Sequence, residues 1–295
     1  MDQYPALQLL GCTLCTVLGG PLVSDVTGAS RSGAYHWPKA ACFLLAYTAI
    51  LIGWRAAQTG AHSLYEGIWA CNQAMVLAAV GMLTSRPVLV AAAVAAVAGD
   101  QVSWYIDVLG YLASGRTKFP IGVAKYLTYP ENQALSKQIT SSHHVWFLPL
   151  CVTTIVSSAA ADGGASGGAI LPLHGFWLSC AFTSCLAIWA RAFTPKAMKD
   201  PADPEGKRAV YLNINGAYEF WQDIKVDFLH ALDNRHPAPY LPYLFVTGNL
   251  SVNLVPYLLL GAISSLFSGR LGVVELAPYV VLIAAFMLIA TRKNS

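Results

Sequence analysis

The stretch CNQAMVLAAVGMLTSRPVLVAAAVAAVAGDQVSWYIDVLG, residues 71–110, contains two long apolar runs that are separated by the short segment TSRP. A helix needs about 20 apolar residues to cross the hydrocarbon core of a bilayer. The two runs therefore predict a pair of membrane-spanning helices that are joined by a tight turn.

The rest of the chain has the same character. Of its 295 residues, 56% are hydrophobic and 11% are charged, and the mean hydropathy is +0.51. A soluble protein of this length needs far more polar surface to cover its core. The net charge of +3 comes without a basic run, which argues against nucleic acid as a partner. We predict one all-α domain over residues 1–295, a polytopic helix bundle surrounded by membrane lipids.

Eight apolar segments are long enough to be membrane spans. They are residues 5–23, 39–58, 63–84, 87–112, 140–162, 169–194, 241–267 and 271–290. The first is short and rich in glycine, so the bundle has seven or eight helices. Of the 18 Lys and Arg residues, 14 lie at the C-terminus or near the loops that follow the second, fourth and sixth spans. The positive-inside rule then places both termini on the cytoplasmic side, or its topological equivalent.

Residues 195–240 form the one long polar segment. In AYEFWQDIKVDFLHAL (217–232), the apolar residues Trp221, Ile224, Phe228 and Leu232 recur at helical spacing. This pattern predicts an amphipathic helix within 212–240 that lies in the membrane interface. The same helix is also suited to docking another membrane protein subunit.

Several spans carry polar side chains, although an ionisable group inside a span costs about 2.5–3.5 kcal/mol on insertion scales. Spans 63–84 and 140–162 begin on the predicted cytoplasmic side, and span 87–112 ends there. The polar residues expected in that leaflet are His62, Glu66, Asp107, His143 and His144, with Cys71 and Asp100 somewhat deeper. Carboxylates that face imidazoles suit acid/base chemistry or a metal, and they also serve as contacts that hold helices together.

The adjacent histidines should play different parts. Neighbouring residues of a helix point about 100° apart, so we expect only one imidazole to face the interior. His144 lies deeper and precedes Trp146, which favours it as the interior residue. Asp107 is then its expected orienting partner, because a carboxylate fixes the tautomer of an imidazole. His143 should point to the interface or to a neighbouring helix.

Residues 71–110 resemble the YwaF-like integral membrane family, which includes animal acyltransferases that remodel ether phospholipids. The similar features are Cys71 at a helix start, Thr84 before a turn, the AGDQ run at 98–101 and Asp107, followed by a histidine that opens a later helix. The resemblance covers about a quarter of the chain. It implies that Cys71 carries the acyl group.

A second resemblance is to sterol isomerase-type membrane proteins. It rests on HSLYE (62–66), YIDVLGYL (105–112) and HVWFLP (144–149). It implies that carboxylates shuttle a proton beside a sterol carbocation stabilised by Trp146. A helix of that family between the first two motifs is absent here.

These observations favour a lipid-modifying enzyme, most simply an acyltransferase, with a polar site in the cytoplasmic-side leaflet. We expect neither a cofactor nor a metal ion. The candidate catalytic residues are Cys71, His144, His143, Asp107, Glu66 and Asp100. A non-catalytic subunit of a larger membrane complex and a small-solute transporter remain as alternatives.

Overall fold

The computed structural model describes residues 4–27, 35–129, 132, 135–161, 171, 173–199, 209–224 and 226–267. This part of the chain is a helix bundle. Its helical elements are α1 (Pro5–Val26), α2 (Pro38–Thr59), η1 (Ala61–Ile68), α3 (Ala70–Leu83), α4 (Pro87–Ala113), η2 (Lys125–Thr128), α5 (Leu135–Thr140), α6 (His143–Ala161), α7 (Leu173–Phe193), η4 (Ile214–Gly216), η5 (Asp227–His230), α8 (Pro237–Leu244), η6 (Phe245–Asn253) and α9 (Leu254–Phe267). Two short strands, β1 (Ala197–Lys199) and β2 (Ala209–Tyr211), pair antiparallel.

Among the described residues, six helical segments are long and apolar enough to cross a membrane, and the pair η1–α3 makes a seventh if it counts as one span. The protein is therefore a multi-pass membrane protein, as predicted. Seven of the eight predicted spans coincide with these segments. The eighth, 271–290, lies outside the described residues. Proline is the first residue of α1, α2, α4 and α8, where its missing N–H costs no helical hydrogen bond.

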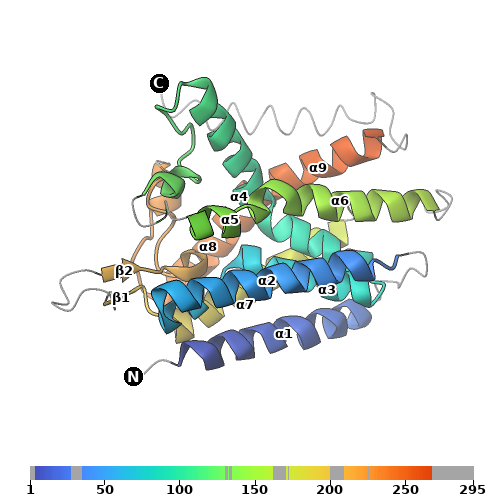
Figure 1. Ribbon diagram of the computed structural model, residues 1–295, viewed down its shortest axis with the longest axis horizontal. Helices are drawn as coiled ribbons and strands as arrows, with labels where there is room; N and C mark the ends of the chain where they lie inside the picture. The colour runs from blue at the N-terminus through green and yellow to red at the C-terminus, as the bar shows by residue number, and fades with distance from the viewer. Residues whose placement is uncertain are drawn as a thin grey trace.

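The centre of the bundle is the pair α3 and α4, which the opening stretch of sequence predicts. Residues 72–82 of α3 and 88–99 of α4 are buried with hardly an exception, and α4 also packs against α6, α7 and α9. Small alanine side chains let these helices approach closely, as membrane helices require. Figure 1 shows the long helices running side by side.

The third span is broken, which the sequence did not predict. Residues 61–68 form a 3₁₀ helix, and the chain bends by 62° at Trp69 before α3 begins. Backbone groups freed by a break must find partners inside a membrane protein. Asn72 Nδ2 donates to Glu66 O (2.7 Å), and Gln73 Nε2 donates to Gly67 O (2.8 Å). Asn215 spans the break itself, since its Oδ1 accepts from Ala70 N and its Nδ2 donates to Ile68 O.

The predicted amphipathic helix at 217–232 is wrong. We call residues 209–236 the cap segment, and past β2 its described part consists of turns with the short 3₁₀ elements η4 and η5. Asn213, Asn215 and Asn234 adopt positive φ angles, so a helix could not extend past either end of 217–232. Side chains also compete for backbone groups, because Asp233 Oδ1 accepts from Phe220 N (2.7 Å). The helical docking face proposed for another subunit is therefore absent from this segment.

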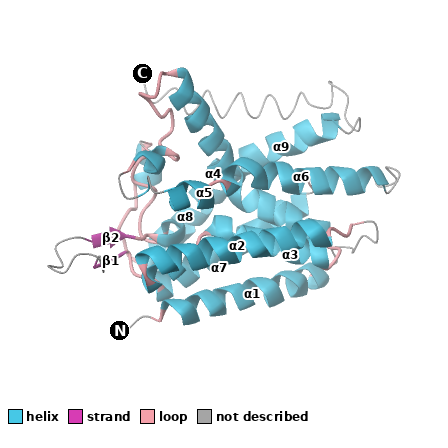
Figure 2. Cartoon of the chain, in the orientation of Figure 1, coloured by secondary structure: helices cyan, strands magenta, loops and turns pink. Residues whose placement is uncertain are grey.

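The cap segment and the loop after α4 meet at one end of the bundle, which we call the loop end. There α2 ends, α3 and α6 begin, and the strands β1 and β2 lie together (Figure 2). Lys125 Nζ contacts Asp223 Oδ1 at 2.8 Å, and the hydroxyl of Tyr129 donates to Asp223 Oδ2. Gly122 has a φ of +107°, and a Cβ there would lie 2.4 Å from the backbone oxygen of Asp223. Only glycine fits this close contact.

Candidate functional site

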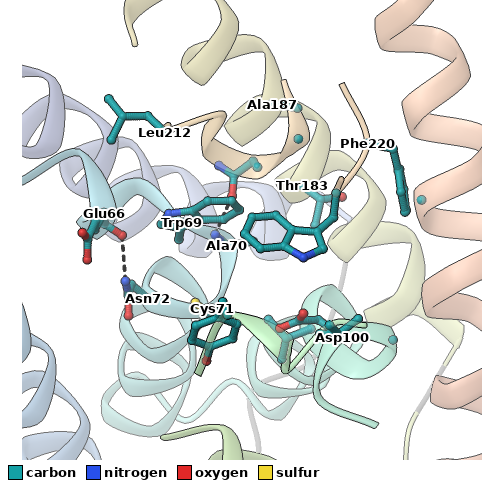
Figure 3. A pocket seen from close by; sticks show the side chains of 18 of the residues that line it. Glu66, Trp69, Ala70, Cys71, Asn72, Asp100, Thr183, Ala187, Leu212 and Phe220 are labelled. Carbon is teal, nitrogen blue, oxygen red and sulfur yellow. Dashed lines mark hydrogen bonds between the residues drawn. The ribbon is translucent and has the colours of Figure 1, made fainter. Parts of the chain in front are cut away.

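A cavity of about 1310 Å³ opens beneath the cap segment. Its walls come from the ends of α2, α3 and α6 at the loop end, from the middle of α4 (96–103), from α7 and from the π-helix η6. Its lining combines polar and aromatic side chains with apolar ones such as Ile188, Leu241 and Phe245. Figure 3 shows Trp69, Cys71 and Asp100 bordering the same space, with Thr183 and Phe220 across from them.

Cys71 occupies the first turn of α3, directly after the break at Trp69. The break thus sets the thiol at the mouth of the cavity, where it is half-buried. The first N–H groups of a helix lack intrahelical partners, and they favour negative charge nearby.

Both histidines face this thiol, which corrects the prediction that only one imidazole faces the interior. His143 is 3% exposed and His144 is 8% exposed, and their ring centroids are 4.2 Å apart. Cys71 Sγ and one imidazole nitrogen from each histidine all lie within 4.8 Å of one another. His143 is the first residue of α6, so no preceding helical turn restricts its ring, which folds back towards the C-terminus of α5.

The hydrogen bonds of the two imidazoles differ. His143 Nδ1 lies 3.0 Å from the backbone oxygen of Thr140. Because a carbonyl oxygen only accepts, Nδ1 carries the proton and Nε2 keeps its lone pair. His144 stacks on Trp104, and its Nδ1 lies 3.6 Å from Asp100 Oδ2. Asp100 keeps about half of its side chain accessible (47%) because it borders the cavity.

Asp107 is not the partner of His144, which corrects a second prediction. The side chain is fully buried, and its carboxylate accepts hydrogen bonds from the backbone N–H groups of Ile121 (2.6 Å), Gly122 (2.9 Å) and Ala124 (2.9 Å). Asp107 therefore holds the loop after α4 against the helix. Its role is structural, because each oxygen is already engaged by that loop.

Glu66 reaches the cavity, but its charge is paired. Arg55 NH1 donates to Glu66 Oε2 at 2.5 Å, and Lys137 Nζ lies 3.8 Å from Oε1. Arg55 also donates to Thr140 Oγ1 (2.9 Å) and Ser141 Oγ (3.3 Å). Arg55 thus links α2 both to Glu66 and to the turn that precedes the histidines. Glu66 thus positions the site and is poorly placed to act on a substrate.

Trp146 does not take the place that a sterol isomerase mechanism requires. Its ring packs against Phe43 and Tyr47 of α2, with centroid distances of 4.9 Å to each. Trp146 is not among the described residues that line the cavity.

Sequence reasoning missed several cavity residues. Tyr126 borders the cavity from the loop after α4, and burial raises the pKa of its phenol well above 10, so the hydroxyl stays protonated. Asn249 and Asn253 of η6 hydrogen-bond Thr183 (3.0 Å) and the N–H of Gly99 (3.1 Å). For Asn249 and Asn253, the sequence did offer a signal: two asparagines four residues apart within an apolar span.

No protein-family model, no curated protein and no solved structure matches this chain.

Proposed function

We propose that the protein is a lipid-modifying membrane enzyme that transfers an acyl chain through a thioester at Cys71. One observation carries the proposal: the thiol and two imidazoles converge within 4.8 Å on the wall of a large cavity inside a membrane bundle. A cysteine nucleophile needs a neighbouring base and a site that accommodates its acyl group. Both are present.

His143 suits the part of general base. Its Nε2 has a free lone pair, because the N–H on Nδ1 donates to Thr140. In the proposed reaction Nε2 takes the proton from Sγ, and the thiolate attacks the carbonyl carbon of a lipid acyl ester. The tetrahedral intermediate collapses, the C–O bond breaks, and the imidazolium protonates the departing alcohol. A second lipid alcohol, deprotonated by the same imidazole, then attacks the thioester and releases Cys71.

The oxyanion of the intermediate needs hydrogen-bond donors. The backbone N–H of Cys71 and the protonated hydroxyl of Tyr126 are the candidate donors, since both residues line the cavity. The cavity of about 1310 Å³ exceeds the roughly 300–1,000 Å³ of a typical small-molecule site. This volume, with apolar lining residues such as Ile188, Leu241 and Phe245, suits an acyl chain.

The test is covalent labelling. The protein, purified in detergent, is incubated with a phospholipid that carries an alkyne-tagged acyl chain, and hydroxylamine-sensitive label is measured. We expect label on the wild-type protein and on Cys185→Ser, a control at an exposed cysteine of α7. Cys71→Ser should lose the label, and His143→Ala should slow its appearance more than His144→Ala does. Full labelling of Cys71→Ser would overturn the proposal.

A further inference from the structure

We propose that Cys71, His143 and His144 also bind a divalent transition-metal ion of the zinc class, with Asp100 as the nearest further oxygen ligand. The inference rests on the site of the proposed function and adds a second occupant to it. It replaces the expectation from the sequence that the site takes no metal. A metal ion on Sγ and an acyl group on Sγ exclude each other.

The spacing of the three groups fits such an ion. Zinc bonds thiolate at about 2.3 Å and imidazole at about 2.0–2.1 Å, so the ligand atoms of a tetrahedral centre lie roughly 3.3–3.6 Å apart. Here the sulfur and the two nitrogens lie within 4.8 Å of one another, before any ion draws them together. Small side-chain rotations close the difference.

The imidazole nitrogens are also available. Among the described residues, His143 Nε2 and His144 Nδ1 have no hydrogen-bond partner, although both residues are more than nine-tenths buried. Burying a polar atom without a partner is costly, and a metal ion would satisfy both. The bond from His143 Nδ1 to Thr140 O is the outer-shell contact that metal-binding histidines usually make.

The charges near the site favour a cation. Asp100 Oδ2 lies 3.6 Å from His144 Nδ1, and a carboxylate together with a thiolate would balance two positive charges inside the bundle. The nearby cation Arg55 is neutralised by Glu66. A thiolate with two imidazoles selects zinc or cobalt over magnesium and calcium, which prefer oxygen ligands.

Cobalt provides a direct test. The full-length protein, purified in detergent and stripped with a chelator, is titrated with Co²⁺. We expect one Co²⁺ per chain, visible d–d bands and a thiolate-to-cobalt charge-transfer band in the near ultraviolet, all displaced by Zn²⁺. Cys71→Ser should lose the charge-transfer band, and His143→Ala and His144→Ala should weaken binding at least tenfold. Cys15→Ser and His174→Ala, which alter exposed residues elsewhere, should bind as wild type does. Circular dichroism checks that each variant is folded.

Two results would overturn the metal site: a charge-transfer band that persists in Cys71→Ser, or Co²⁺ binding no stronger than that of the His143→Ala/His144→Ala double variant. Acyl labelling is measured on the same metal-free samples. Labelling without metal binding would support the acyltransferase proposal and overturn the proposed metal site. Metal binding with no labelling, before or after chelation, removes the acyltransferase and keeps the metal site. If both hold, Zn²⁺ should suppress the labelling of Cys71.

Discussion

At the scale of single residues, the site depends on how each buried polar group is satisfied. Asp107 and His143 are both buried in the bundle, yet their surroundings differ. The carboxylate of Asp107 accepts hydrogen bonds from three backbone N–H groups, so both of its oxygens are used in holding the loop. His143 has one nitrogen bonded and one free towards Cys71, which is what a base or a metal ligand requires.

Asp107→Asn tests this distinction. The asparagine side chain would place an NH₂ donor against the backbone N–H donors of the loop. The charge-assisted hydrogen bonds to the carboxylate are therefore lost. We expect the free energy of unfolding in detergent to fall by about 1.5–3 kcal/mol, the usual worth of a hydrogen bond to a charged group. Acyl labelling of the protein that remains folded should be unchanged. Normal stability combined with lost labelling would instead restore Asp107 as a partner of the histidines.

At the scale of elements, the break between η1 and α3 builds the site. The bend at Trp69 ends one helical segment and starts another, and the new N-terminus falls beside Cys71. Asn215 holds the break from a distance of 145 residues in sequence. The cap segment therefore fixes the position of the thiol as well as covering the cavity.

Asn215→Ala removes the bonds to Ala70 N and Ile68 O. We expect a loss of about 2 kcal/mol in stability, from two hydrogen bonds of roughly 1 kcal/mol each, and slower acyl labelling of Cys71. Asn132→Ala is the matched control, because Asn132 Nδ2 donates within its own loop to Tyr126 O. Equal thermal unfolding of the two variants would show that the break does not depend on Asn215.

The cap segment should also respond to pH through His230. Burial lowers the pKa of this imidazole, but hydrogen bonds to Asp233 and to Ile224 O outweigh burial, and the pKa is raised above 6.5. The stabilising contribution is complete below about pH 6.5, and it is lost as pH rises through the raised value. Hydrogen exchange of 226–236, corrected for intrinsic rates, should therefore show weaker protection at pH 8.5 than at pH 6. His230→Gln should remove this difference, and a difference that survives would assign it to another group.

Hydropathy predicted the spans because burial in lipid demands apolar length whatever the partners are. It failed at Trp69, because 61–83 is apolar enough for one helix and the bond that bends it comes from Asn215. It failed at 217–232, where the side chains of Asp233 and His230 bind backbone groups in place of a helical pattern. The shared depth of Cys71, Asp100 and the histidines followed from the topology. The directions of the two imidazoles did not follow from the topology, because they depend on the turn at Ser141 and Ser142 that precedes α6.

At the scale of the whole molecule, the helices alternate so that the loop after α4 and the cap segment share the loop end. We propose from the distribution of Lys and Arg that this end faces the cytoplasm. Lys118→Cys and Asp227→Cys, at exposed positions of the loop end, should then react with a membrane-impermeant maleimide from the cytoplasmic side only. Thr27→Cys, at the far end of α1, should react only from the opposite side. Labelling of Lys118→Cys and Thr27→Cys from one side would contradict the arrangement.

The π-helix η6 has a consequence for helical phase. A π turn holds more residues than an α turn, so α9 leaves η6 rotated relative to a straight continuation of α8. That rotation brings Asn253 to the N–H of Gly99, where a Cβ on Gly99 would lie 2.4 Å from Val252 O. Deleting one residue within 245–253 would allow an ordinary α-helix and turn Asn253 away from α4. This contact therefore depends on the number of residues between α8 and α9 as well as on the side chain of Asn253.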